Sequence, residues 1–199
     1  MDYKAETKKS YNKYTEEFSR KFDEHFKNFV MEEADIFLRH LKGKRILDIG
    51  AGPGIHSEYF RARGYNSLCI DISEEMVKLC KSKGLESEVM DAEDLQLDET
   101  FDGIWAYTVL LHIKKSNVPS VIKKISELLK PKGIFGLALK EGVGEEFKIN
   151  DKYPGTQRWF SYFTEEEVKI LYDKHFELLH LSKTHTSHGI FANYILRKK

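Results

Sequence analysis

The sequence lacks the features that mark several classes of protein. Lys and Arg together number 32, as do Asp and Glu, so a net charge of zero gives no general attraction to nucleic acid or to an anionic membrane. No apolar run approaches the roughly 20 residues of a membrane-spanning helix. The polar segment 1–10 does not resemble a signal peptide. We therefore expect a cytoplasmic protein that binds neither nucleic acid nor a membrane.

Cysteine is also scarce. The two cysteines, Cys69 and Cys80, lack the short spacing of metal or redox motifs and lie in apolar patterns, so we interpret both as reduced packing residues. His185 and His188 flank an expected turn, and two isolated histidines rarely form a metal site. We therefore expect no bound metal. The chain of 199 residues has neither repeat nor linker, which is typical of one α/β domain.

The most informative stretch that the sequence does contain is 45–54. A short apolar run from Ile46, typical of a buried strand, continues directly into Gly50, Gly52 and Gly54. A helical pattern follows at once. A strand, a glycine-rich turn and a helix in this order bring backbone N–H groups close to a ligand. The turn therefore predicts a site for a nucleoside-containing cofactor.

Apolar runs and capping residues predict a doubly wound, three-layer α-β-α fold around this turn. The expected strands are 45–49, 67–70, 87–90, 101–106, 134–139, 176–182 and 190–197, and the expected helices are 10–41, 55–63, 74–83, 118–129 and 164–172. A short connector ending in Gly189 joins the last two strands. We therefore expect an antiparallel C-terminal hairpin on a seven-stranded, mostly parallel sheet.

We expect a single domain, 1–199, with an N-terminal helical region at 1–42 and a core at 43–199. The amphipathic pattern of the helical region suits a helix that covers the sheet. With Tyr11 and Tyr14 at its start, it equally suits a lid over a cofactor. The polar, glycine-rich segment at about 141–163 is expected to be an irregular cap loop.

Two acidic residues follow strands at one edge of the predicted sheet. Asp71 ends the second strand and Asp91 the third, where a carboxylate can accept hydrogen bonds from ribose hydroxyls or from an adenine amine. Either acid taken singly can equally cap a loop. The glycines run G-x-G-x-G rather than the dinucleotide pattern G-x-G-x-x-G, and Pro53 removes an N–H donor that a phosphate would use. This spacing disfavours an NAD-linked oxidoreductase, which is the weakest alternative.

Residues 46–54 resemble the first motif of the class I, Rossmann-like S-adenosylmethionine-dependent methyltransferases, and residues 111–113, 140–142, 158–160 and Tyr162 are similar to the members of that family that act on small molecules. Residues 69–73 resemble the second motif of that family, 89–92 the third and 101–104 the fourth. Residues 128–133 are similar to the segment before its fifth strand. The resemblance implies S-adenosyl-L-methionine as the cofactor and S-adenosyl-L-homocysteine as the product.

The resemblance also implies roles for individual residues. The glycine turn would pass close to the methionine moiety, Asp71 would hold the ribose, Asp91 would hold the adenine edge, and the backbone around Tyr107 would meet the amino group. The cofactor-binding candidates are Tyr14, Asp48, Gly50, Ala51, Gly52, Asp71, Ile72, Asp91, Ala92 and Tyr107.

The acceptor side of the site is less specific. Residues 105–112 lack the Asn/Asp-Pro-Pro-Tyr/Phe pattern of enzymes that methylate amino groups of adenine, cytosine or glutamine. We expect a small-molecule acceptor, and the pocket candidates are Tyr11, His112, Lys140, Arg158, Trp159 and Tyr162. His112 is the candidate catalytic base by its position after the fourth strand, although a histidine that caps a short helix suits this position slightly better.

Two further functions stay open as alternatives. Lysines between 114 and 130 form a basic face that favours an RNA (tRNA) methyltransferase, but the acidic segment 86–102 would repel a phosphate backbone. A non-catalytic partner subunit that binds the cofactor would share all the donor-side motifs. It would lack an acceptor cavity.

Overall fold

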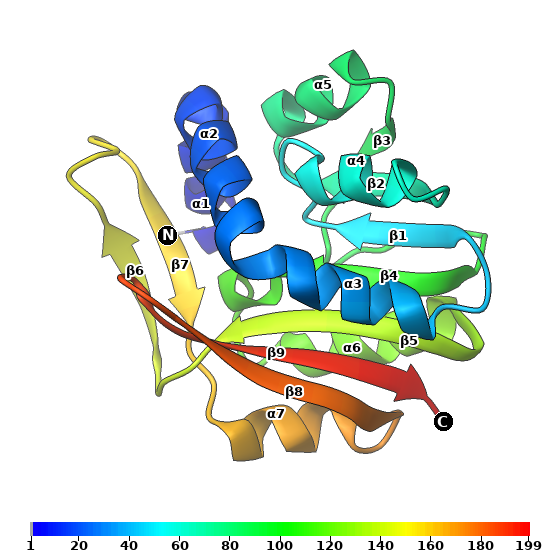
Figure 1. The fold of residues 1–199 in the computed structure, drawn as a ribbon. Helices are drawn as coiled ribbons and strands as arrows, with labels where there is room; N and C mark the ends of the chain where they lie inside the picture. The colour runs from blue at the N-terminus through cyan, green and yellow to red at the C-terminus, as the bar shows by residue number, and fades with distance from the viewer. Residues whose placement is uncertain (1) are drawn as a thin grey trace.

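The computed structural model describes residues 2–199 as a central sheet with helices on both faces (Figure 1). The sheet has seven strands in the order β3-β2-β1-β4-β5-β9-β8. Neighbouring strands from β3 to β5 pair in parallel, whereas β9 pairs antiparallel with both β5 and β8. The predicted three-layer fold, with its antiparallel C-terminal hairpin, is confirmed.

The strands of this sheet are β1 (Arg45–Ile49), β2 (Asn66–Asp71), β3 (Glu86–Val89), β4 (Phe101–Tyr107), β5 (Leu129–Lys140), β8 (Phe176–Thr186) and β9 (Gly189–Lys198). The helices that flank it are α3 (Met31–His40), α4 (Ile55–Arg61), α5 (Glu74–Ser82), α6 (Val118–Leu128) and α7 (Glu165–Tyr172). None of the helices in residues 2–199 combines the length and the apolar character needed to cross a bilayer.

Two apolar layers fix the helices on the sheet. Successive residues of a strand point to opposite faces, so Trp105 of β4 packs on Phe37 of α3, while its neighbour Ile104 packs on the side of α6. Trp105, Phe37 and Ile104 are fully buried, and each contributes roughly 1.5–3 kcal/mol through burial. This packing holds the C-terminal ends of β1, β2, β3 and β4 at one edge, where the glycine turn lies.

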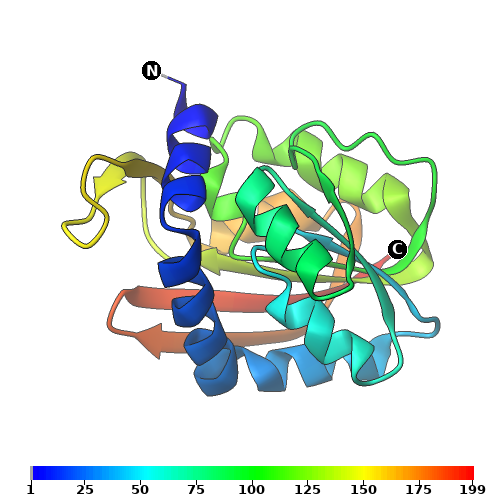
Figure 2. The same ribbon diagram turned by 90° about the horizontal axis from the view of Figure 1, so that it is seen from above.

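The N-terminal helical region begins earlier than predicted. It consists of α1 (Tyr3–Lys13), α2 (Thr15–His25) and a π-helical turn (Phe26–Val30) that leads into α3. The side chain of Asp2 caps α1 by accepting hydrogen bonds from the N–H groups of Lys4 and Ala5. Because α1 buries Thr7 and Ser10 rather than an apolar stripe, hydrophobic periodicity did not reveal it. Figure 2 shows α1 and α2 as an arm across one end of the sheet.

The segment predicted as an irregular loop contains a β-hairpin instead. β6 (Glu145–Ile149) pairs antiparallel with β7 (Gln157–Ser161), and Phe147 faces Trp159 with ring centroids 5.0 Å apart. Most of β6 is exposed, and the alternation of apolar and polar residues in its sequence is confined to the short run Glu146–Ile149. The hairpin lies beside α1, since Trp159 N–H donates to Thr7 Oγ1 at 3.0 Å.

β5 also begins earlier than predicted. We expected residues 131–133 to separate the helix from the strand, but the ladder with β4 continues past them through an irregular register between Phe101 and Gly103. Lys132 adopts a φ of +61° within this stretch. The strand therefore starts at Leu129, directly after α6.

Gly50 tests the packing of the turn, and Gly64 provides a matched control. Both have positive φ, +65° and +79°, but a Cβ on Gly50 would lie 2.4 Å from Val109 Cγ2, whereas a Cβ on Gly64 would meet nothing within 4 Å. We expect Gly64→Ala to cost about 1 kcal/mol in backbone strain and Gly50→Ala to cost roughly 1–3 kcal/mol more, because of overpacking. Urea unfolding measures both, and adding Val109→Ala should restore part of the loss in G50A. Equal losses in the two single variants would contradict this packing.

Candidate active site

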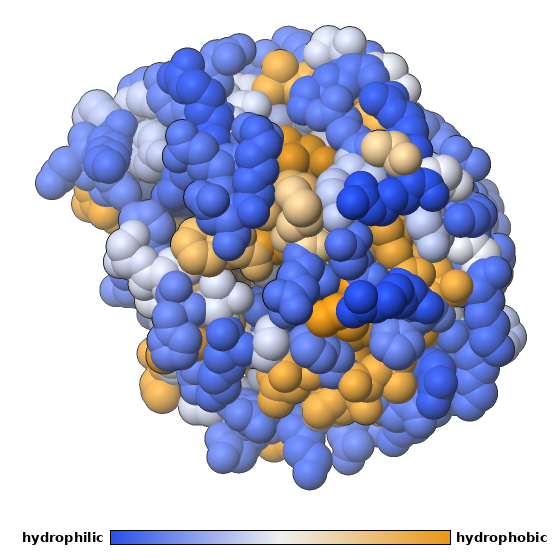
Figure 3. All heavy atoms as spheres, in the orientation of Figure 1, coloured by the Kyte–Doolittle hydropathy of each residue, from blue (hydrophilic) through white to orange (hydrophobic). Residues whose placement is uncertain are grey.

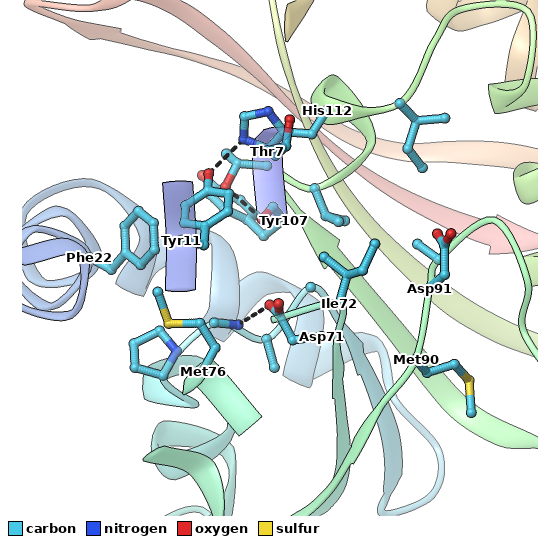
Figure 4. Close-up of a pocket in the computed structure, with 18 of the residues that line it drawn as sticks. Thr7, Tyr11, Phe22, Asp71, Ile72, Met76, Met90, Asp91, Tyr107 and His112 are labelled. Atoms are coloured by element: carbon cyan, nitrogen blue, oxygen red, sulfur yellow. Dashed lines mark hydrogen bonds between the residues drawn. The ribbon is translucent and has the colours of Figure 1, made fainter. Parts of the chain in front are cut away.

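A cavity opens where β1, β2, β3 and β4 end, between this edge of the sheet and the α1–α2 arm. It encloses about 1060 Å³ of empty space, counting solvent at its mouth. In the space-filling view, apolar side chains lie between the polar surfaces of α2 and α5 (Figure 3). The lining includes Thr7, Tyr11, Phe22, Gly50, Gly52, Asp71, Ile72, Met76, Met90, Asp91, Tyr107 and His112 (Figure 4).

The glycine turn is tied to the end of β2. Gly52 N–H donates to Asp71 Oδ2 at 2.9 Å, and Ser73 N–H donates to Asp71 Oδ1 at 2.8 Å. Burial raises the pKa of Asp71, although hydrogen bonds from the backbone N–H groups of Ser73, Gly52 and Ile72 oppose the rise. Each carboxylate oxygen keeps a second lone pair for a hydroxyl donor on the cavity side. A Cβ on Gly52 would point toward Phe22, 3.6 Å away, so this glycine presents bare backbone to the cavity.

The end of β3 carries the second acid and a cation that the sequence analysis missed. Lys4 Nζ of α1 lies 2.7 Å from Asp91 Oδ2 and 3.2 Å from Glu93 Oε1. Burial alone would lower the pKa of Lys4, but its bonds to the two acids outweigh burial and raise it. Ile72 lies between Asp71 and Asp91, and Met90 lies beside Asp91 (Figure 4), so apolar side chains line the cavity next to both acids. This end of the cavity therefore combines apolar side chains with carboxylate oxygens.

Asp48 lies beneath the turn rather than in the cavity lining. It is 1% exposed, and Ser57 Oγ donates to its Oδ2 at 2.8 Å. Burial raises the pKa of Asp48 to about 7, although the bond from Ser57 opposes the rise. The charge of Asp71 adds to the rise. Asp48 therefore holds the loop before α4 from below.

Tyr107 and Thr108 shape the cavity at the end of β4. The Tyr107 ring stacks on Trp105 with centroids 4.9 Å apart, and its hydroxyl donates to Asn193 Oδ1 at 2.7 Å. Thr108 has a φ of +60°, which is strained for a β-branched residue. Its hydroxyl donates to the Tyr107 carbonyl at 2.6 Å. The backbone at this point is therefore bent away from the strand direction where it borders the cavity.

His112 has a defined tautomer. Its Nδ1 lies 2.6 Å from the Trp159 carbonyl oxygen, which can only accept, so Nδ1 carries the proton. Nε2 then accepts from the Tyr11 hydroxyl at 2.7 Å, and Tyr11 accepts from Arg158 at 3.1 Å. Burial lowers the pKa of His112 to about 3, and the charge of Arg158 lowers it further. The chain Arg158–Tyr11–His112 thus ends in a neutral imidazole at the cavity wall.

The structure brings most of the predicted residues together. Gly50, Ala51, Gly52, Asp71, Ile72, Asp91, Ala92, Tyr107, Tyr11 and His112 all line the cavity. Tyr14 lies outside it, because its hydroxyl donates to the Pro154 carbonyl at 2.7 Å and its ring packs on Tyr153. Arg158 and Trp159 border the cavity through Tyr11 and His112.

Other lining residues escaped the sequence analysis. They are Lys4, Thr7, Phe22, His25, Ile55, His56, Met76, Met90, Glu93, Thr108 and Val109, among others. Those on α1 and α2 were missed because no local sequence pattern shows where these helices pack on the rest of the protein. The Asp2 cap was a usable signal for the start of α1, and hence for placing Lys4 and Thr7 on one helix.

The sequence matches a known domain family and named relatives. Residues 47–137 match the methyltransferase domain family. The chain is 35% identical over 101 residues to a ubiquinone biosynthesis O-methyltransferase of Xanthomonas oryzae, which covers 47% of this chain and 41% of that protein. It is 28% identical over 181 residues to an uncharacterised protein of Methanocaldococcus jannaschii, covering 87% and 84%. The chain thus spans about two fifths of the length of the ubiquinone biosynthesis relative.

Solved structures share the fold. An S-adenosylmethionine-dependent methyltransferase from Methanosarcina mazei superposes with a TM-score of 0.72 at 22% identity, covering 82% of this chain and 96% of that one. A 1,6-didemethyltoxoflavin N1-methyltransferase from Burkholderia thailandensis, solved with S-adenosylhomocysteine, gives a TM-score of 0.67 at 23% identity, covering 83% and 76%.

Asp48 predicts a pH-dependent stability. In the folded protein the pKa of Asp48 is about 7, against about 4 in an unfolded chain, so stability is lost as pH rises through this window. Asparagine carries no charge at either pH. The free energy of unfolding of Asp48→Asn should therefore rise relative to that of the parent by about 1–3 kcal/mol between pH 5 and pH 8. Thermal unfolding at both pH values measures the gain. The exposed Asp98→Asn is the control, and a similar pH dependence in both variants would contradict the prediction.

His112 predicts a spectroscopic signature. Because the folded pKa of His112 is about 3, the ring should stay neutral from pH 8 to pH 5, with Nδ1 protonated. Two-dimensional 15N–1H NMR of imidazole-labelled protein distinguishes the tautomers. Tyr11→Phe should keep the Nδ1–H tautomer, since the Trp159 carbonyl still accepts its proton. A midpoint near pH 6 for this resonance, or a mixture of tautomers, would refute the assignment.

Proposed function

We propose that the chain is a class I S-adenosylmethionine-dependent methyltransferase that transfers the methyl group of S-adenosylmethionine to a small molecule, and the match of residues 47–137 to the methyltransferase domain family supports this. The observation that carries the proposal is the meeting of the glycine turn, Asp71 and Asp91 around one cavity that also reaches His112. The names of the ubiquinone biosynthesis O-methyltransferase and of the toxoflavin-type N-methyltransferase support a small-molecule acceptor.

The part of the cavity lined by the glycine turn, Asp71 and Asp91, here called the donor half, suits S-adenosylmethionine. The spare lone pairs of Asp71 would accept the two ribose hydroxyls, which would also offset the cost of burying its charge. Ile72 and Met90 would hold the adenine ring between them, and Asp91 would accept from its amine. The bare backbone of Gly52 would leave room for the methionine moiety.

The cofactor supplies a methyl group already activated on a sulfonium. The residues of this chain would then position and desolvate the reactants, and such positioning can account for roughly 7–11 kcal/mol of a barrier. The ring faces of Tyr11, Phe22 and Tyr107 at the cavity wall would stabilise a positive charge near them. The α1–α2 arm would exclude water, which makes it a lid as well as a cover for the sheet.

Where the acceptor must lose a proton, Tyr11 and His112 would relay it, and because the pKa of His112 is about 3, the imidazole would hold that proton only transiently. The Nε2 lone pair of His112 is directed at the Tyr11 hydroxyl, so a proton from the acceptor would reach His112 through Tyr11. Arg158 would stabilise the phenolate formed in passing, because it already donates to that oxygen. In this role Tyr11 is the group that touches the acceptor.

Binding of S-adenosylhomocysteine tests the donor half. We expect calorimetry to detect binding to the parent protein. Asp71→Asn should weaken it by at least about tenfold, because an amide replaces one of two acceptor oxygens facing the ribose, a loss of roughly 1.4 kcal/mol or more. Asp98→Asn, an exposed acid outside the cavity lining, is the matched control.

The thermal midpoint of each variant is recorded in the same buffer, so that loss of folding is not taken for loss of binding. The proposal fails if folded parent protein shows no heat with either S-adenosylmethionine or S-adenosylhomocysteine. It also fails if Asp71→Asn and Asp98→Asn bind S-adenosylhomocysteine equally well.

A further inference from the structure

Lys140 is a buried cation without an anionic partner. It ends β5 and is 8% exposed. Its Nζ lies over three rings, with centroid distances of 5.6 Å to Phe160, 5.5 Å to Tyr162 and 6.0 Å to Phe191. In the described part of the chain no carboxylate forms an ion pair with it. Ring faces offset only part of the cost of removing an ammonium from water.

Arg158 repeats this pattern on β7. Its guanidinium lies 4.8 Å from the ring centroid of Phe18 and 5.2 Å from that of Phe160. The bond to Tyr11 is its one hydrogen bond among residues 2–199, and no acid there pairs with it. A guanidinium has five N–H donors, so most of them have no protein acceptor. Both cations contact the Phe160 ring, at centroid distances of 5.2 Å from Arg158 and 5.6 Å from Lys140.

Further cations surround this pair. Lys21 of α2 is half-buried, and Lys148 and Lys152 are exposed at the rim. Burial lowers the pKa of Lys140, and Lys148, Arg158 and Lys21 lower it further, which shows that these charges act on one another. Burial and the charge of Lys21 also lower the pKa of His25, and Lys21, Lys140, Lys152 and Arg158 lower the pKa of His188. The acid that faces the group is Glu146 of β6, which accepts from Tyr162 and lies 3.6 Å from Lys148. In a chain of zero net charge, this is a strong local excess.

The cationic pair adjoins the cavity at the end away from Asp91. Tyr11 lines the cavity and is bonded to Arg158. His25 also lines it, and its ring lies 6.1 Å from Phe191, one of the three rings around Lys140. Figure 4 shows Tyr11 and His112 together at one side and Asp91 at the other.

We propose that Lys140 and Arg158 bind an oxyanion, a carboxylate or a phosphate, on a planar methyl acceptor whose ring packs on Phe160. This inference rests on the proposed function. A bound oxyanion would supply the partner that Lys140 lacks and would take the forked donors of Arg158. The acceptor's reacting atom would then face Tyr11 and His112. The charge thereby selects acids over their neutral analogues.

Matched small probes test the inference. Benzoate, phenyl phosphate, inorganic phosphate and neutral benzamide are titrated into the full chain saturated with S-adenosylhomocysteine, and binding is followed by NMR of the probe or by calorimetry. At least one ring-bearing anion should bind about tenfold or more tighter than benzamide, with an affinity that falls as salt rises. Comparing the affinity of phenyl phosphate with that of inorganic phosphate shows whether the aromatic ring contributes to binding.

Variants locate the binding. Lys140→Met and Arg158→Met should each weaken the anion by about tenfold or more, whereas Lys169→Met, an exposed lysine on α7, should change nothing. Without ligand, K140M should also raise the thermal midpoint, because methionine removes an unpaired buried charge at similar volume. A merely structural lysine would give the opposite shift.

Three outcomes decide against the inference. It is overturned if no anion binds at millimolar concentration, if benzamide binds as well as both benzoate and phenyl phosphate, or if K140M and R158M bind anions like the parent. The titrations are repeated without S-adenosylhomocysteine. Anion binding in a protein that does not bind S-adenosylhomocysteine would refute the proposed function while leaving the oxyanion site in place. Normal S-adenosylhomocysteine binding without anion binding would refute the oxyanion site while leaving the proposed function in place.

Discussion

The hydrogen bond between the Gly52 N–H and the Asp71 carboxylate is the constraint on which the donor half of the site depends. It joins the turn after β1 to the end of β2, two segments that the parallel pairing of these strands already places side by side. Ala51 N–H donates to the Ile70 carbonyl at 3.0 Å and supports the same connection. The left-handed conformation of Gly50 and Gly52 is needed for this geometry. Gly50 moreover lies against Val109, which ties the turn to the end of β4.

The fold and the donor half could be predicted from the sequence because their signals are local. Ile46 to Ile49 is an uninterrupted apolar run, which a strand buried on both faces requires, and three glycines directly follow it. Asp71 ends β2 and Asp91 lies two residues beyond the end of β3, so their common edge follows from parallel topology alone. By contrast, Asp48 belongs to the same motif but is turned beneath the sheet edge, bonded to Ser57, and motif position could not distinguish these two orientations.

The acceptor half could not be predicted in the same way because it is assembled from distant segments. Tyr11, His112 and Arg158 meet although 101 residues separate the first two and 147 separate the first and last. The hairpin β6–β7 that carries Arg158 has only a short alternation of apolar and polar residues in β6, which is largely exposed, and none in β7. Its position depends on Trp159, whose N–H contacts α1 and whose carbonyl orients His112. Tertiary packing, rather than local propensity, therefore decides which side chains face the acceptor.

The bonds between α1 and the strand ends affect how fast ligands can exchange. Lys4 pairs with Asp91 and Glu93, Lys8 pairs with Glu74, and Tyr11 bonds to His112, so α1 is held over the cavity chiefly by polar contacts. Partly exposed ion pairs open readily and are screened by salt. A nucleoside leaving this cavity therefore waits for a set of weak, charge-dependent contacts to open together. The residence time of the bound nucleoside then depends on ionic strength as well as on its contacts with the apolar side chains of the cavity.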